Sequence, residues 1–340
     1  MKMPALPRRR ALLALGLALA ALVACKDSPK SDASTSGGAS ATGKRLKIAV
    51  IPKGTTHEFW KSVHAGAVKA SKELDVDIVW KGPLKEDDLK AQIDVVNTFV
   101  AQGVSGIVVA PLNDSALRAP VKAAVQAKIP VVVFDSDLQG DDHVSFVATD
   151  NQAAGKLAAE GMAKKLGGKG NVIVLRYQEG SASTQNREKG FLDGIKSSQD
   201  LKVISDNQYG GATTESAFQK AESLLIAHKA QTGAVQGIFT PNESTTFGML
   251  QAIKKSGVNA PDKRIRFYGF DTSEKLVSAL RDGDIDGLVV QDPFNMGYLA
   301  VKTMTEHLRG QKVEKRIDTG ARLVEKENLD DPAVKEIMQP

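Results

Sequence analysis

The chain has 340 residues, of which 42% are hydrophobic and 25% charged, and its formal net charge is +5. This length exceeds what one hydrophobic core usually organises, so the chain is expected to form two lobes. Part of the positive charge lies in the N-terminal segment, and no dense basic block follows, so the charge does not indicate a nucleic-acid-binding protein.

The N-terminal segment is typical of an export signal followed by a tether. Three arginines at residues 8–10 precede an uncharged apolar stretch, residues 11–24, which is short for a membrane span but suits a secretory signal. The sequence LVAC resembles a bacterial lipobox, which implies cleavage before Cys25 and lipid attachment to it. Cys25 is the only cysteine, so no disulfide forms within the chain. We therefore expect a signal peptide at residues 1–24 and a lipidated, flexible tether at residues 25–43.

Two alternatives stay open for this segment. Cys25 could be an ordinary core cysteine behind a signal without lipid, and the arginines could direct twin-arginine export instead of general secretion. With lipidation, the protein would be exported and anchored to a bacterial membrane, facing the periplasm or the cell surface.

Beyond the tether, apolar runs of strand length alternate with longer amphipathic segments. The runs are continuous, which favours parallel strands covered on both faces by helices, a doubly wound α/β pattern. The expected strands are residues 46–51, 106–110, 130–134, 171–175, 236–240, 265–270 and 286–290. The expected helices are residues 58–73, 87–102, 114–127, 152–166, 185–198, 214–227, 244–255 and 295–308.

The first expected strand leads into a polar loop, residues 53–57, at the kind of strand end where α/β proteins bind ligands. We expect Lys53 to reach a ligand oxygen, with Phe59 or Trp60 against the ligand's apolar face. Adjacent positions on a helix diverge by about 100°, so only one of the two rings is expected to be deeply buried in its own lobe. His57 is equally compatible with ligand contact and with a role in helix entry.

The chain contains two similar halves. GIVVAPLNDS at 106–115 corresponds to GIFTPNES at 237–244, and the next strands end in FDS and FDT. This order predicts two lobes of like topology. It also delivers Asp135 and Asp271 to the C-terminal ends of strands, where ligand contacts are expected.

These features together resemble the periplasmic sugar-binding proteins of the ribose and galactose type, from residue 44 to about 325. The carrying features are Phe59-Trp60, the run PVVVFDSD, Thr149-Asp150-Asn151, Arg187 before Gly190-Phe191, Pro241-Asn242-Glu243, Gly269-Phe270-Asp271 and Val290-Gln291. The resemblance implies two lobes, each a doubly wound parallel sheet flanked by helices, with the ligand in the cleft between them. The implied N-terminal lobe comprises residues 44–149 and 292–319, and the C-terminal lobe residues 150–291 and 320–340. Three crossings near Thr149, Gln291 and Gly320 would join the lobes.

A sugar presents apolar C–H faces and a rim of hydroxyls, so its site needs aromatic rings and planar polar groups that pair with adjacent hydroxyls. The predicted ligand-binding residues are Lys53, His57, Phe59, Trp60, Asp135, Ser136, Asp137, Arg187, Asn242, Asp271 and Gln291. Each polar group has a structural alternative. Asp271 and Asn242 could merely cap helices, Arg187 could form a surface ion pair, and Gln291 could only cover a crossing.

The first lobe, through Lys53 and Asp135-Ser136-Asp137, is also similar to the rhamnose and autoinducer-sugar binders, so the exact sugar stays open. A neutral sugar is preferred over a sugar acid because the nearby carboxylates would repel an anion.

Motifs for other functions are missing from the sequence. It contains no G-x-G-x-x-G loop after the first strand, no phosphate-binding loop and no second histidine at zinc-protease spacing. We therefore expect no catalysis, no cofactor and no metal. A sugar-responsive transcription regulator would carry a DNA-binding helix-turn-helix where this chain has the export signal, so that class of protein is not expected either. The resemblance implies a monomeric substrate-binding lipoprotein that delivers a monosaccharide to the permease and ATPase subunits of an ABC importer. A lipoprotein that reports sugar to a membrane receptor remains the alternative.

Overall fold

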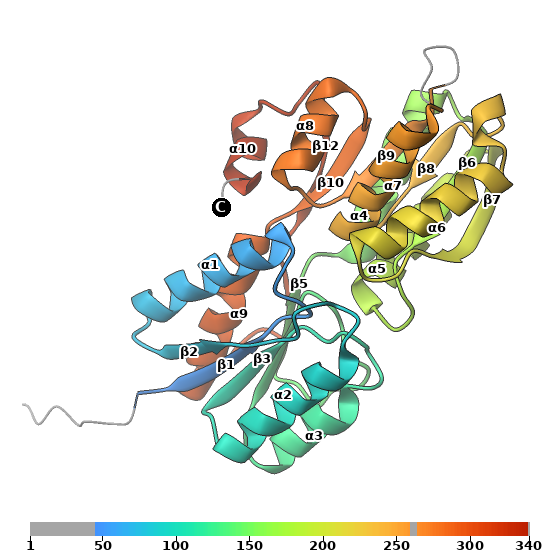
Figure 1. The fold of residues 1–340 in the computed structure, drawn as a ribbon. Coiled ribbons are helices and arrows are strands. Elements are labelled where there is room, and N and C mark those ends of the chain that lie inside the picture. The colour runs from blue at the N-terminus through green and yellow to red at the C-terminus, as the bar shows by residue number, and fades with distance from the viewer. Residues whose placement is uncertain (1–44, 259–263, 339–340) are drawn as a thin grey trace, which may run out of the picture. The chain divides into compact units, whose positions relative to one another are not determined.

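A computed structural model describes residues 45–258 and 264–338. The predicted signal peptide and tether, with Cys25, lie outside the described residues. The described strands form two six-stranded sheets, each flanked by helices (Figure 1). The predicted two-lobed α/β fold is thereby confirmed.

The N-terminal lobe is built on a sheet in which every pairing is parallel. In sheet order its strands are β11 (Arg316–Asp318), β5 (Ser145–Ala148), β4 (Val131–Phe134), β3 (Gly106–Val109), β1 (Lys47–Ile51) and β2 (Asp77–Trp80). Helices α1 (Glu58–Glu73) and α9 (Pro293–Leu308) cover one face, and α2 (Leu89–Gln102) and α3 (Arg118–Gln126) cover the other. Side chains alternate along β1, with Ile48 packing toward α1 and α9 and Ala49 toward α2 and α3.

The C-terminal lobe repeats this strand order. Its sheet runs β12 (Ala321–Glu325), β10 (Gly287–Gln291), β9 (Arg266–Phe270), β8 (Gly237–Phe239), β6 (Lys169–Arg176) and β7 (Asp200–Tyr209), and only β12 is antiparallel to its neighbour. Helices α4 (Asn151–Leu166) and α5 (Ala182–Ile195) pack on one face. The other face carries α6 (Thr214–Ala227), the 3₁₀ turn η1 (Ala230–Thr232), α7 (Glu243–Ser256), α8 (Glu274–Asp282) and α10 (Pro332–Met338).

The chain passes between the two sheets three times, after β5, after β10 and after β11. Two of these passages are hydrogen-bonded to each other. Thr149 Oγ1 donates to Gly320 O at 3.0 Å, and the Asp150 amide donates to Asp318 Oδ1 at 3.0 Å. Paired passages of this kind can serve as a hinge between lobes.

All seven expected strands and all eight expected helices occur, and α1 and α6 have the expected bounds. The strands that the sequence did not reveal are β2, β5, β7, β11 and β12, and four of these are the edge strands of the two sheets. An edge strand is less covered than a central one, so it lacks the continuous apolar run that marks a central parallel strand. The short helices α8 and α10 were also missed.

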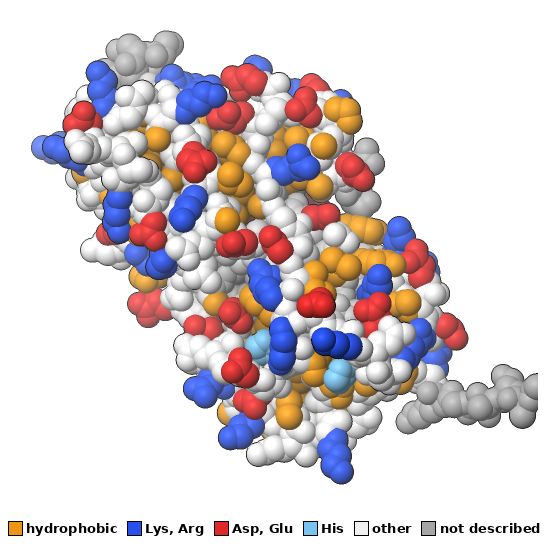
Figure 2. All heavy atoms as spheres, turned by 180° about the vertical axis from the view of Figure 1, so that it is seen from behind, with side chains coloured by type: hydrophobic (Ala, Val, Ile, Leu, Met, Phe, Trp, Pro, Cys, Tyr) orange, Lys and Arg blue, Asp and Glu red, His pale blue; other side chains and the backbone are white. Residues whose placement is uncertain are grey.

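The surface mixes charges of both signs. Lys and Arg side chains are interspersed with Asp and Glu over the face seen in Figure 2. Among the described residues, no helix combines the length and the apolar character needed to cross a membrane.

Candidate ligand-binding site

The loop between β1 and α1 forms one wall of the site, and Lys53 is its buried cation, only 3% exposed. Lys53 Nζ lies 3.1 Å from Asp135 Oδ2, 2.9 Å from Ser183 Oγ and 3.3 Å from Ser181 Oγ. An ammonium group has three donors, so these contacts use all of them. In this conformation Lys53 holds Asp135 and links the two lobes, and it has no further N–H to offer a ligand.

Asp135 and Asp271 occupy equivalent positions after β4 and β9, as the internal repeat predicts. Both have left-handed backbones, with φ of 58° and 67°, a conformation that Asp adopts more readily than most residues. Each amide donates to the next strand, from Asp135 to Val147 O at 3.0 Å and from Asp271 to Val289 O at 2.9 Å. The N-cap of α8 is Ser273, so the alternative that Asp271 merely caps this helix is wrong.

Arg187 lies inside α5 and is 2% exposed, so the alternative of a surface ion pair is wrong. Its Nε donates to Asn151 Oδ1 at 2.7 Å, and its Nη1 donates to Pro241 O at 2.9 Å. Nη1 also lies 3.9 Å from Asp271 Oδ2, and the guanidinium carbon is 4.5 Å from the centroid of the Phe270 ring. These contacts fix the plane of the fork while leaving further N–H groups for a ligand.

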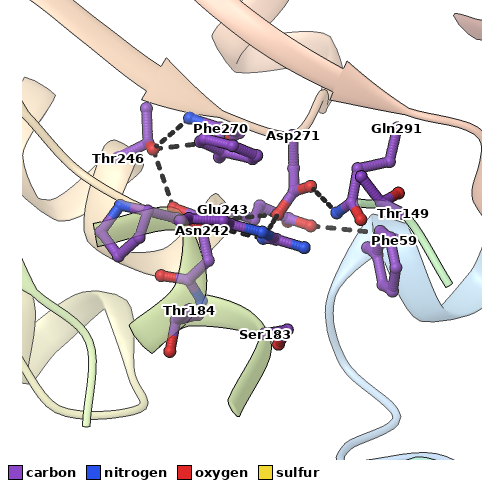
Figure 3. A network of polar contacts seen from close by, with 12 residues as sticks. Phe59, Thr149, Ser183, Thr184, Asn242, Glu243, Thr246, Phe270, Asp271 and Gln291 are labelled. Atoms are coloured by element: carbon purple, nitrogen blue, oxygen red, sulfur yellow. Dashed lines mark hydrogen bonds and ion pairs between the residues drawn. The ribbon is translucent and has the colours of Figure 1, made fainter. Parts of the chain in front are cut away.

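Asn242 and Gln291 complete the polar wall of the C-terminal lobe. Asn242 is the N-cap of α7 and also lines the cavity, so capping does not exclude the predicted ligand contact. Gln291 Nε2 donates to Asp271 Oδ1 at 2.7 Å, and Asp271 lies between Gln291 and Glu243 (Figure 3). Gln291 Oε1 is buried and has no hydrogen-bond partner among the described residues. A buried acceptor without a partner is costly, so this oxygen is suited to accept from a ligand hydroxyl.

Side chains from both lobes enclose a small cavity. Its volume is about 30 Å³. The lining residues are Lys53, His57, Phe59, Trp60, Glu86, Asp135, Tyr177, Ser183, Thr184, Arg187, Asn242, Glu243, Asp271 and Gln291. This narrow, polar space has room for only a few water molecules in the conformation described, so a sugar ring enters only when the lobes or the lining side chains move apart.

Two predicted residues do not line this cavity. Ser136 is fully buried, and its Oγ accepts from the Ser183 amide at 3.1 Å. Asp137 is exposed, accepts from the Leu138 amide at 2.8 Å and borders a separate hollow. The left-handed turn at Asp135 directs the residues that follow it away from the cavity.

Phe59 and Trp60 both line the cavity and, with both lobes present, are both buried, at 8% and 3% exposure. Their ring centroids are 4.9 Å apart at 87°, and the Trp60 ring meets Phe134 edge-on at 6.1 Å. Trp60 is covered by its own lobe. The start of α1 at Phe59 is covered from the other lobe, because Glu243 Oε2 accepts from the Phe59 amide at 3.2 Å.

Five lining residues were not predicted from the sequence: Glu86, Tyr177, Ser183, Thr184 and Glu243. Tyr177 directly follows β6, so the rule that ligands lie at strand ends could have found it. Glu243 is adjacent to Asn242 in the repeated segment. Glu86 lies in a polar loop whose sequence does not distinguish it from surface acids.

The charges of the cavity are largely paired. Lys53 lies beside Asp135, Arg187 beside Asp271, and His57 Nδ1 is 2.8 Å from Glu86 Oε1. Glu243 forms no ion pair within 4.0 Å among the described residues, and burial raises its pKa to about 7. No group of three or more His, Cys, Asp or Glu side chains in the described ranges could hold a metal ion.

Comparison with known sequences decides the family. The periplasmic binding protein domain matches residues 48–312. The chain belongs to the periplasmic binding protein family. The ribose import binding protein of Bacillus subtilis is 28% identical over 312 residues, which cover 91% of this chain and 96% of the relative.

Solved structures agree with this assignment. A carbohydrate transporter solute-binding protein from Agrobacterium radiobacter, in complex with D-arabinose, is 34% identical with a TM-score of 0.82, covering 87% of this chain and 99% of that one. An ABC transporter solute-binding protein from Agrobacterium vitis, with bound D-fucose, is 36% identical with a TM-score of 0.81, covering 86% and 100%. This periplasmic binding protein is therefore of the ribose type, a binding protein and not an enzyme, and its family implies an exported protein.

Proposed function

We propose that this periplasmic binding protein holds one neutral monosaccharide between its lobes and delivers it to the permease and ATPase subunits of an ABC importer. The observation that carries the proposal is Gln291 Oε1, a buried acceptor without a partner, in a cavity that also contains the Arg187 fork. Such groups suit a ligand whose hydroxyls donate and accept at neighbouring atoms.

The pairing of charges supports a neutral ligand. Each buried cation of the cavity already has a carboxylate beside it, and Glu243 has no cation within ion-pair distance among the described residues. A sugar acid would bring another negative charge into this enclosure without a free cation to meet it, which costs free energy. The sugar acids are thus expected to bind more weakly than the corresponding neutral sugars.

The aromatic side chains and the position of the cavity between the lobes support a single sugar ring. Phe59 and Trp60 offer apolar surface to the C–H face of a pyranose or furanose. Relatives with bound D-arabinose and D-fucose make these two sugars the first candidates for testing.

We also propose that Cys25 carries a lipid that anchors the exported protein to a membrane, with residues 26–43 as the tether and a monomer as the working form. The support is the LVAC sequence after an apolar stretch. Metabolic labelling with a radioactive fatty acid tests it, with Cys25→Ser as the control. An unlabelled wild-type protein would contradict lipidation, and it would not bear on the proposal that the protein binds a sugar.

A thermal-shift screen tests the ligand class. A protein that begins at residue 44 keeps the compact unit of the structure and omits the predicted signal peptide and tether. A ligand that binds only the folded protein at a hundredfold excess over Kd stabilises it by about 2.7 kcal/mol. The screen should include pentoses, hexoses, deoxysugars, polyols and sugar acids, with amino acids and nucleosides for comparison. A reproducible shift with an amino acid or nucleoside, and none with any sugar, would contradict the proposal.

A further inference from the structure

Glu86 gathers three hydrogen-bond donors at the edge of the cavity. It lies in the loop between β2 and α2 and is only 7% exposed. Its Oε1 accepts from Trp60 Nε1 at 2.7 Å and lies 2.8 Å from His57 Nδ1. Its Oε2 accepts from the Tyr177 hydroxyl at 2.5 Å. The carboxylate is therefore committed to protein partners, although it lines the cavity.

These partners come from different lobes. His57 and Trp60 belong to the start of α1 in the N-terminal lobe, whereas Tyr177 follows β6 in the C-terminal lobe. A second bond makes the same crossing, because Gln178 Nε2 donates to Glu86 O at 3.1 Å. Separation of the lobes would break the contacts to Tyr177 and Gln178 and keep those to His57 and Trp60.

The contact to Glu86 is one of three contacts that hold the Trp60 ring. The indole is held edge-on by Phe59 on one side and Phe134 on another, with ring planes at 87° and 86°. The bond from Nε1 to Glu86 adds a polar constraint that apolar packing cannot supply. An aromatic ring against a sugar must present its face at a defined angle, so this constraint bears directly on binding.

We propose that Glu86 is a positioning residue of the sugar site, which orients Trp60 and His57 and, through Tyr177, ties their orientation to closure of the lobes. The inference rests on the proposed sugar-binding function. Glu86 then acts without touching the sugar. When the lobes close, the Tyr177 hydroxyl reaches Glu86 and adds the last of its three hydrogen bonds.

The electrostatic setting agrees with this geometry. Burial alone would raise the pKa of Glu86, but His57, Lys53 and Tyr177 face it and lower the value to about 2. Burial alone would lower the pKa of His57, but Glu86, with Glu243 and Asp271 facing it as well, raises the value to about 9. At neutral pH the closed protein thus holds a carboxylate and an imidazolium in contact.

Tyr177→Phe removes the hydroxyl that crosses the cleft and leaves the ring in place. Calorimetric titration with D-arabinose and D-fucose, or with the best sugar of the thermal screen, should give an affinity at least about tenfold lower than that of the wild type, because the acceptor is charged. Tyr209→Phe is the matched control. Its hydroxyl makes no hydrogen bond within the part of the chain described, so its affinity should match the wild type.

Glu86→Gln keeps the shape of the side chain and removes the charge. We expect a loss of affinity at least as large as for Tyr177→Phe. In NMR titrations of the protein without sugar, His57, assigned with His57→Gln, should titrate near pH 9 in the wild type and at a clearly lower pH in Glu86→Gln. In Tyr177→Phe the pKa of His57 should stay high, whereas a general loss of structure would bring it back toward its ordinary value.

Failure of the positioning role of Glu86 can be distinguished from failure of the proposed sugar binding. Wild-type affinity in both Tyr177→Phe and Glu86→Gln would overturn the positioning role, as would an unchanged His57 titration in Glu86→Gln. If no sugar binds the wild type, the proposed function fails. The His57 titration needs no ligand and still decides whether Glu86 governs the histidine.

Discussion

Close packing of α4 against α5 places Arg187, and Gly155→Ala is expected to disturb it. A Cβ at position 155 would lie 2.0 Å from Arg187 O and 2.9 Å from the Phe191 amide nitrogen. Both obstacles are backbone atoms, which cannot rotate away as the end of a side chain can. Because a Cβ contact below 3.0 Å essentially never occurs, α5 must shift by about 1 Å to admit the methyl group.

The size of the effect follows from two opposing contributions. Overpacking a tight interface costs about 1–3 kcal/mol, and a rigid backbone obstacle favours the upper end. Replacing a helical glycine by alanine stabilises the helix by up to about 1 kcal/mol. We expect the free energy of unfolding to fall by about 2 kcal/mol. The displaced carbonyl is that of Arg187 itself, so the fork moves, and affinity for the sugar should fall about tenfold, equivalent to about 1.4 kcal/mol.

The N-terminal lobe supplies a matched control in Gly66→Ala. Its added Cβ would lie 1.9 Å from Phe294 O, in the corresponding contact of α1 with α9. Urea unfolding should show a similar loss of stability in both variants, whereas calorimetry should show the larger loss of affinity in Gly155→Ala. Wild-type affinity in a destabilised Gly155→Ala variant would refute the link between this helix contact and Arg187. Wild-type stability would refute the packing argument itself.

Two further substitutions test buried charges of the site. Lys53→Met leaves the Asp135 carboxylate without its cation. In urea unfolding without sugar, we expect the free energy of unfolding to fall by about 3–5 kcal/mol. Unchanged stability would show that the ion pair between Lys53 and Asp135 does not stabilise the fold. Burial raises the pKa of Glu243 from 4.5 to about 7, so the folded protein binds more protons than the unfolded chain between these values and loses stability as pH rises through them. Glu243→Gln should flatten the dependence of stability on pH between 4.5 and 7, compared with the wild type, and an identical slope would show that this carboxyl does not titrate in that range.

The sequence by itself determined the architecture of the two lobes and most of the side chains that line the candidate site. Central strands of parallel sheets are buried on both faces, so their apolar runs are visible without any tertiary information. Residues that follow such strands must lie at the carboxyl edge of a sheet, which is why Asp135 and Asp271 could be assigned to the site in advance. The repeat of these positions in two halves supported the assignment.

Only the tertiary structure decided which groups meet across the cleft. Lys53 and Ser183 are 130 residues apart, too far for any local sequence pattern to relate them. Their side chains nevertheless meet at 2.9 Å, and this contact occupies one of the donors of the lysine. Glu86 and Tyr177 are 91 residues apart and meet at 2.5 Å. Asp137 follows the left-handed turn at Asp135 and lies outside the cavity, and Phe59 is buried beside Trp60. Periodicity reports the environment of one element, whereas contacts between lobes depend on how two finished elements approach each other, which no local pattern records.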